Sequence, residues 1–153
     1  IDETNRQAAL ELIRERWLTT QMVIRGEVFD MARAEGVLAL EGGAIAGLAT
    51  YGVRGGTCEI LSLDSLAERR GVGTELVRRV AAIAQERGCT RVIAVTTNDN
   101  LRALRFWQKR GFDMARLYRD VLDVSRKLKP EIPLVGEDGI PLRHEIELEY
   151  RIQ

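Results

Sequence analysis

The most constraining feature of the sequence is a pair of glycines, Gly71 and Gly73, placed where an amphipathic helix begins. Glycine lets the backbone turn tightly, and the first turn of a helix carries unpaired N–H groups and a partial positive charge. The residues that follow keep apolar side chains at helical spacing until Gly88. This stretch therefore predicts an anion-binding turn ahead of a helix, suited to a phosphate group.

Length and composition exclude several classes of protein. The 153 residues suffice for one domain with its own core, and the 23 basic and 23 acidic side chains cancel, so no overall field attracts nucleic acid or an anionic membrane. There is no apolar run long enough to span a membrane, and two cysteines with one histidine offer neither a disulfide framework nor a metal site. We expect a single cytoplasmic domain over residues 1–153 with reduced cysteines. Because the chain begins at Ile1, we also expect a further N-terminal segment.

Hydrophobic periodicity predicts a mixed order of helices and strands. We expect a helix over 4–17, a short helix over 27–34, an antiparallel meander over 37–63, a helix over 71–88, a strand over 92–95 and a helix over 100–111. From Ile146 to Ile152 apolar residues alternate with charged ones, which predicts a last strand with one buried and one solvated face. All three prolines lie between Tyr118 and this strand, so 119–143 is expected to be an ordered insertion with a helical turn over 121–128.

The spacing around the glycines excludes two common phosphate motifs. A P-loop needs a lysine and a hydroxyl residue after its last glycine, and a dinucleotide fingerprint needs a third glycine where Leu76 stands. Both motifs turn sharply from strand to helix, whereas residues 64–70 intervene here after Leu63. On the glycines alone, a phosphate-binding turn and a plain loop ending are equally good interpretations.

The helix over 100–111 carries a second pattern. Residues 100–112, Asn-Leu-Arg-Ala-Leu-Arg-Phe-Trp-Gln-Lys-Arg-Gly-Phe, resemble the Asn-x-x-Ala-x-x-aromatic-aromatic-x-x-x-Gly-Phe pattern of the GNAT superfamily of acyl-coenzyme A-dependent N-acetyltransferases. Residues 69–73, Arg-Arg-Gly-Val-Gly, are similar to the Gln/Arg-x-x-Gly-x-Gly pyrophosphate loop of that family. The two motifs stand in the order and spacing of the family.

The resemblance implies an α/β (α+β) fold with a mixed, twisted sheet flanked by helices and splayed between the Leu63 and Val92 strands, where acetyl-coenzyme A enters as cosubstrate. Backbone N–H groups of 69–74 would hold the pyrophosphate, and the strand ending at Leu63 and Asp64 would pair with the pantetheine arm and offer an oxyanion hole. Asn100 would contact the cofactor or cap its helix. The implied cofactor-binding residues are Leu63, Asp64, Arg69, Arg70, Gly71, Val72, Gly73, Thr74, Asn100 and Trp107.

Two positions depart from the family pattern. Glu68 stands where the family has Gln or Arg, which leaves the pyrophosphate to the backbone. Trp107 stands where many members carry the tyrosine that protonates the departing thiolate, and an indole N–H is not a usable acid. Tyr118 is a candidate replacement, and an ordinary structural role for this tyrosine is the alternative.

The acceptor amine needs a base, because an alkylamine with a pKa near ~10.4 is almost wholly protonated at pH 7. Glu59 is the candidate, since many family members have a glutamate at the start of this strand. Alternation places it on the face of Leu61 and Leu63. A strand-edge charge is its alternative role, and Asp64 is the second candidate base.

The resemblance implies transfer of the acetyl group of acetyl-coenzyme A to a primary amine by direct attack. The alternatives are a longer acyl group, another nucleophile, or a coenzyme A-binding sensor or interaction module without catalysis, which Trp107 suggests. The acceptor and homodimer formation stay open. The insertion is basic at its ends, which suits either an anionic acceptor or a solvated face; these residues are Arg119, Arg126, Lys127, Lys129, Arg143 and His144.

Overall fold

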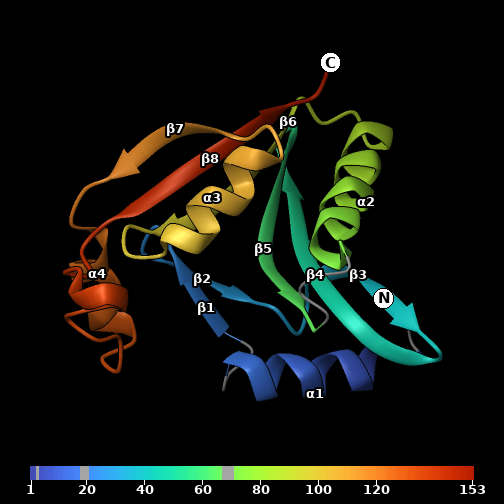
Figure 1. Cartoon of the computed structure of the whole chain (residues 1–153), viewed down its shortest axis with the longest axis horizontal. Helices are drawn as coiled ribbons and strands as arrows, with labels where there is room; N and C mark the ends of the chain where they lie inside the picture. The colour runs from blue at the N-terminus through green and yellow to red at the C-terminus, as the bar shows by residue number, and fades with distance from the viewer. Residues whose placement is uncertain (3, 18–20, 67–70) are drawn as a thin grey trace. The chain divides into compact units, whose positions relative to one another are not determined.

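The computed structural model describes residues 1–2, 4–17, 21–66 and 71–153 (Figure 1). Its elements are α1 (Arg6–Trp17), β1 (Gln21–Ile24), β2 (Glu27–Asp30), β3 (Glu35–Glu41), β4 (Ala44–Arg54), β5 (Thr57–Ser65), α2 (Val72–Glu86), β6 (Arg91–Thr97), α3 (Leu101–Lys109), β7 (Asp113–Tyr118), α4 (Val121–Leu128), a 3-10 turn (Glu137–Gly139) and β8 (Glu145–Arg151). The main sheet has the strand order β3-β4-β5-β6-β8-β7, and the mixed α/β fold expected from the sequence is confirmed.

Contacts divide the chain into two compact units. The first comprises residues 1–22, 30–92 and 152–153, and the second comprises 23–29 and 93–151. The first unit holds α1, α2 and the strands β3 to β5, whereas α3, α4, β7 and β8 belong to the second. The expectation of one domain over residues 1–153 stays a prediction.

In the first unit, the antiparallel meander is confirmed as β3, β4 and β5, and α2 lies along β4 and β5 (Figure 1). Gly47 permits this approach: a Cβ there would lie 2.6 Å from Val72 Cγ1 and 2.9 Å from the carbonyl oxygen of Asp64. The start of α2 therefore rests directly on the backbone of the two strands. The helix ends as predicted, with Gly88 in the left-handed region at φ 74°.

The opposite face of β4 is covered by α1. Leu48 is buried and packs with Ala9 and Ile13 of α1 and with Met31. Leu48 follows Gly47 in β4, and successive strand residues point to opposite faces. The β4–β5 ladder therefore has an α1 face and an α2 face.

The short helix expected over 27–34 is wrong, because Glu27–Asp30 forms the strand β2, paired with β1. Arg25 and Gly26 connect the two strands with φ of 54° and 74°, as a tight two-residue hairpin turn requires. A left-handed arginine is uncommon, so the sequence did not signal this turn.

The glutamate face of β8 is not solvated as alternation predicted, because Glu145 and Glu147 are buried. Both carboxylates have hydrogen-bond donors within the second unit. The Arg25 N–H donates to Glu145 Oε1 at 2.7 Å, and the Tyr118 hydroxyl donates to Glu147 Oε1 at 2.9 Å. These bonds make the burial of two charged groups tolerable.

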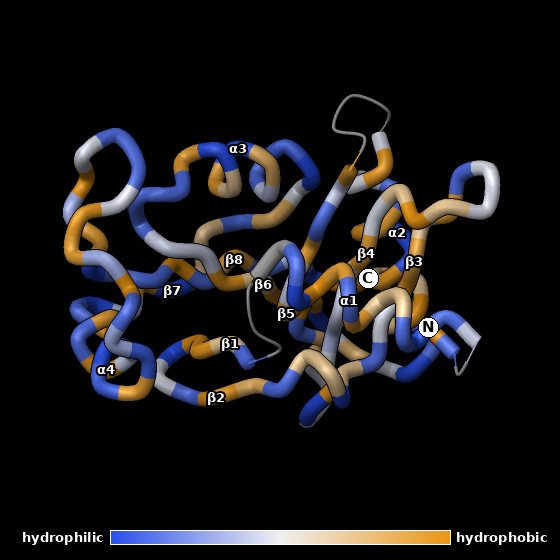
Figure 2. Tube along the Cα trace, turned by 90° about the horizontal axis from the view of Figure 1, so that it is seen from below, coloured by the Kyte–Doolittle hydropathy of each residue, from blue (hydrophilic) through white to orange (hydrophobic). Residues whose placement is uncertain are grey.

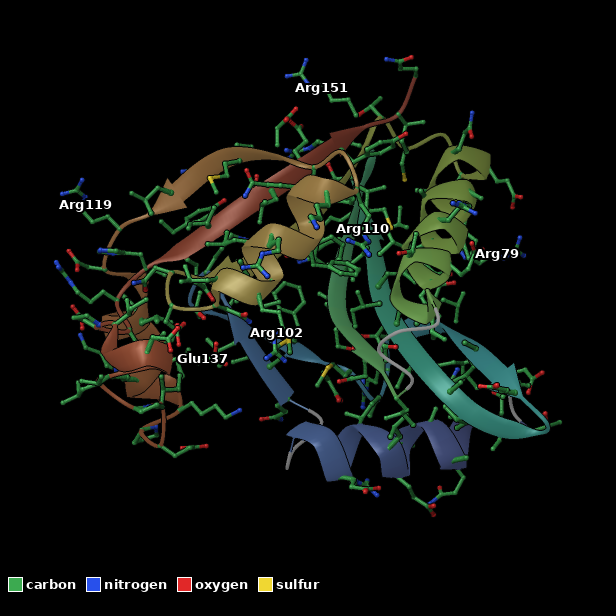
Figure 3. The ribbon with its side chains drawn as sticks, viewed as in Figure 1. Arg79, Arg102, Arg110, Arg119, Glu137 and Arg151 are labelled. Carbon is green, nitrogen blue, oxygen red and sulfur yellow. The ribbon has the colours of Figure 1, made fainter. Side chains whose placement is uncertain are left out.

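The proline-containing insertion is ordered, and the predicted helical turn is α4. Its loop is tied to the turn between β6 and α3. Asp99 Oδ2 accepts the N–H of Glu137 at 2.9 Å, and Asn98 Oδ1 accepts the N–H groups of Arg143 and His144 at 3.0 and 2.9 Å. Glu137 lies beside α4 in Figure 3. Short polar side chains after β6 therefore hold the insertion in place.

An exposed ion pair joins β3 to the end of α2 in the first unit. Arg87 Nη1 and Nη2 each lie 2.6 Å from a carboxylate oxygen of Glu35. This hydrogen bonding to Arg87 lowers the pKa of Glu35 from its ordinary value. Because the Arg87 and Glu35 side chains are 40% and 52% exposed, solvent screens the pair.

Replacing Glu35 by glutamine should lower the free energy of unfolding at pH 7 by about 0.2–1 kcal/mol, as for other exposed pairs. The folded-state pKa of Glu35 lies below the ordinary 4.5, so its contribution is present above that value and is lost as the pH falls through the lowered pKa. Urea unfolding at pH 7 and pH 3 measures the difference, with Glu86→Gln on α2 as control. Superimposable curves for wild type and Glu35→Gln at pH 7 would contradict the prediction.

Candidate functional site

The strand β5 carries one extra residue relative to β4. Thr50 pairs with Ser62, but the next residue of β4, Tyr51, pairs with Ile60, which leaves Leu61 unmatched. The alternation of side chains along β5 therefore changes phase at Leu61.

This β-bulge places three polar side chains of β5 on the α1 face. Glu59, Ser62 and Asp64 lie opposite Gly52, Thr50 and Leu48, which alternate along one face of β4. The prediction that Glu59 shares a face with Leu63 is wrong, because Leu63 lies opposite Ala49 on the α2 face. Simple alternation does not count the extra residue.

Thr50, Glu59, Ser62 and Asp64 form a buried polar row. Glu59, Ser62 and Asp64 are 6%, 4% and 8% exposed. Thr50 Oγ1 and Ser62 Oγ lie 2.6 Å apart and share a hydrogen bond. In register, this hydroxyl pair stands between the two carboxylates. The row thus combines groups that accept protons with groups that can relay them.

The glycine turn forms the N-terminus of α2. Gly71 has φ 72°, in the left-handed region, and its carbonyl accepts the N–H of Glu75 at 3.0 Å as an early bond of the helix. The N–H groups of Val72 and Gly73 precede that bond, so the helix itself supplies no acceptor for them. No side chain of residue 71 caps this end.

This helix start fits a phosphate ligand. Its N–H groups and the helix dipole favour an anion, and no atom of a described residue lies within 4 Å of a Cβ built at Gly71. The Ser65 hydroxyl lies on the α2 face at the end of β5 and is buried, with no hydrogen-bond partner among the residues that the structure describes. Sequence reasoning missed Ser65. The predicted ligands Arg69 and Arg70, with Glu68, lie outside the described residues.

In the second unit, Asn100 caps α3, because its Oδ1 accepts the N–H of Ala103 at 3.0 Å. Hydrophilic and hydrophobic residues alternate along this helix (Figure 2). Trp107 is on the buried side and packs against Phe106 and Phe112, with ring centroids 5.0 and 4.9 Å away. The structure therefore shows a cap and a packing group; cofactor contacts of Asn100 and Trp107 stay predictions.

The hydroxyl of Tyr118 is engaged by Glu147. Burial raises the pKa of Tyr118, and the hydrogen bond to Glu147 raises this pKa further, while Arg116 opposes the shift. The guanidinium carbon of Arg116 lies 4.7 Å from the centre of the Tyr118 ring. Since a carboxylate can only accept, the hydroxyl proton points at Glu147. This contact supports the structural alternative for Tyr118, and its role as an acid stays a prediction.

Basic residues at the ends of the insertion make internal contacts. Arg143 Nη2 lies 3.0 Å from Asp120 Oδ1, and Arg126 Nη2 donates to the carbonyl of Pro133 at 2.8 Å. His144 Nδ1 accepts the N–H of Asp120 at 2.8 Å. These contacts favour a structural role for the three residues over an anionic acceptor site.

The cysteines and the other potential ligands form no second candidate site among the residues that the structure describes. Cys58 and Cys89 are free and buried, as expected, and burial raises the pKa of Cys58 to about 12. Among the described residues there is no cluster of side chains that could hold a metal ion. No helix in the same ranges is long and apolar enough to cross a membrane.

Comparison with known proteins gives consistent matches. The model of the acetyltransferase (GNAT) family matches residues 5–112. The uncharacterized protein YdhI of Bacillus subtilis is 39% identical over 146 residues, which is 95% of this chain and 91% of YdhI. A Bacillus subtilis acetyltransferase in complex with CoA is 24% identical with a TM-score of 0.67, over 79% of this chain and 78% of that one. An Elizabethkingia anophelis GNAT acetyltransferase with acetyl-CoA bound is 21% identical with a TM-score of 0.67, over 93% and 82% of the two chains.

Replacing Glu147 by glutamine should lower the pKa of Tyr118, because the charged acceptor of its hydroxyl proton is removed. An NMR titration with isotope-labelled tyrosine measures this, with Tyr118→Phe to assign the signal and Tyr150 on β8 as internal control. An unchanged Tyr118 titration would show that burial alone raises its pKa.

Proposed function

Because the chain belongs to the acetyltransferase (GNAT) family, we propose that it transfers the acetyl group of acetyl-coenzyme A to a primary amine. The family match over residues 5–112 carries this proposal, since it spans both the glycine turn and α3. Two solved proteins of the same fold contain CoA or acetyl-CoA, which supports this cosubstrate for the present chain.

The start of α2 is the proposed pyrophosphate site. The N–H groups of Val72 and Gly73 precede the helical hydrogen bonds, and Gly71 adopts a left-handed conformation just before them. Arg69 and Arg70 would add charge-assisted contacts to the phosphates. The buried Ser65 hydroxyl on the same face is a further donor for the bound cosubstrate.

The proposed site for the pantetheine arm is the backbone of β5 at Leu63 and Asp64, whose peptide groups would pair with its amides. Asn100, the N-cap of α3, and Trp107 within this helix complete the proposed cofactor-binding set. The cap of α3 uses the side-chain oxygen of Asn100, and the proposed contact uses its NH₂ group.

Bound acetyl-coenzyme A supplies the acetyl thioester. The amine nitrogen bonds to the acetyl carbon while the carbon–sulfur bond breaks, and the sulfur leaves with the bonding electrons. An N–H of β5 near Leu63 is proposed to stabilise the charge on the carbonyl oxygen. A thiol with a pKa of about 8.5 can leave as the thiolate without a general acid, so the step can proceed with Trp107 at the position of the family's acid.

Glu59 is the proposed base, with Asp64 as the second candidate. Both carboxylates are buried on the α1 face, and the hydroxyl pair of Thr50 and Ser62 stands between them in register. The proton of the attacking amine passes to Glu59 directly or through water. Tyr118 is the candidate acid for the departing thiolate, a role that requires its hydroxyl to leave Glu147.

A coenzyme A-binding sensor without catalysis is the second candidate function. The observation that favours it is the buried Trp107, a packing group at the position of a family acid. Assays of thiol release with a panel of amines separate the two functions. Tight binding of acetyl-coenzyme A without thiol release for any amine would favour the sensor.

Acetyl-coenzyme A at about 100 times its dissociation constant should add roughly 2.7 kcal/mol of stability, which raises the Tm by about 5–11 °C for a chain of this size. A thermal shift assay measures this, with ATP and NAD as controls because the turn lacks their motifs. A shift with ATP or NAD and none with the thioester would refute the proposed site.

Glu59→Gln should lower kcat by about 10²–10⁴, the usual contribution of a general base, and leave the affinity for acetyl-coenzyme A unchanged. The loss should be deepest at neutral pH and smaller at high pH, where more of the amine is already neutral. Asp64→Asn is the matched control, since Asp64 shares the face and the burial of Glu59. A loss in Asp64→Asn with normal rates in Glu59→Gln would exchange the two roles.

A further inference from the structure

Gly52 is a glycine inside β4 that the backbone and the packing do not require. It is not among the residues with positive φ, so its conformation is open to any residue. A Cβ added there meets no atom of a described residue within 4 Å. A glycine inside a strand destabilises the strand, because its backbone has more conformational freedom to lose on folding and it has no side chain to pack. Its presence here calls for another explanation.

At two other glycines of the same sheet, close packing leaves no room for a side chain. A Cβ at Gly47 would lie 2.6 Å from Val72 Cγ1, and a Cβ at Gly36 would lie 2.7 Å from the carbonyl oxygen of Ala49. Neighbouring atoms fill the space beside these two glycines. Beside Gly52, no residue that the structure describes fills the corresponding space.

That open space lies directly across the ladder from Glu59. Register pairs Gly52 with Glu59, and side chains of paired residues start about 4.5–5.5 Å apart. The next pair on this face is Thr50 with Ser62, whose hydroxyls bond to each other. A small group placed over Gly52 would therefore meet the Glu59 carboxylate on one side and the hydroxyl pair on another.

We propose that Gly52 determines acceptor specificity. The amine-bearing carbon of the acceptor occupies the space that a side chain at residue 52 would fill, and the amine nitrogen contacts Glu59. We call this position over Gly52 the seat. This inference rests on the proposed acetyl transfer and names its acceptor class, a primary amine on an unbranched methylene carbon, as in an alkylamine or a lysine side chain. A branch on that carbon would extend toward Thr50 and Ser62, the next pair on this face. The carboxylate of an α-amino acid would be repelled by Glu59.

The two isomers n-butylamine and sec-butylamine test the seat, because they share formula and charge and differ in branching at the amine carbon. Wild-type kcat/KM, followed by thiol release from acetyl-coenzyme A, should favour n-butylamine by at least about tenfold, the discrimination that one extra carbon produces in a shaped pocket.

Gly52→Ala adds one Cβ in the open space. With n-butylamine, kcat/KM should fall by about 10–200-fold, the range expected for one carbon in such a pocket. The affinity for acetyl-coenzyme A should not change, and the Tm should stay equal or rise, because alanine restricts the unfolded chain. Val53→Ile is the matched control: it adds one carbon at the next position, which points to the opposite face, and should leave kcat/KM unchanged.

Equal use of the two isomers by the wild type, or unchanged kcat/KM in Gly52→Ala, would overturn the seat and leave the acetyl transfer intact. If the wild type releases no thiol, an NMR titration of n-butylamine in the presence of coenzyme A decides. Binding that is lost in Gly52→Ala supports the seat without the proposed transfer. No binding to the wild type overturns the seat as well.

Discussion

One extra residue in β5, Leu61, decides which side chains of the site face the same way. Without it, Glu59 would point to the α2 face, away from Asp64. With it, Glu59 joins Asp64 on the α1 face. The bulge thus gathers the two candidate bases and the hydroxyl pair of Thr50 and Ser62 on one face of the ladder.

The anion-binding turn depends on a second backbone constraint, the absence of a side chain at Gly47. Only this absence lets Val72 approach the strands closely, so the first turn of α2 rests on the ends of β4 and β5. Gly52, five positions along the same strand, leaves space that no described residue fills. In β4, Gly47 therefore permits a close helix contact on the α2 face, whereas Gly52 leaves space on the α1 face.

Local patterns in the sequence predicted most helices and strands, because apolar spacing and glycine stops act over a few residues. They failed where a distant partner decides the outcome. The hairpin of β1 and β2 turns at a left-handed Arg25, which no local rule favours. Glu145 and Glu147 are buried because the hairpin turn and Tyr118, both remote in sequence, supply their hydrogen bonds.

By itself, the sequence determined the mixed α/β class and the glycine turn ahead of α2, since both follow from local patterns, and it offered Asn100 as either a helix cap or a cofactor contact. It also supplied Glu59 as the candidate base, through resemblance to a family. Only the tertiary structure decided which residues lie on the same face of the sheet as Glu59. The register of β4 against β5 brings Gly52, Thr50, Ser62 and Asp64 to its face. Strand pairing is a relation between two segments, and one unmatched residue reverses every side chain beyond it, so spacing along a single strand cannot reveal it.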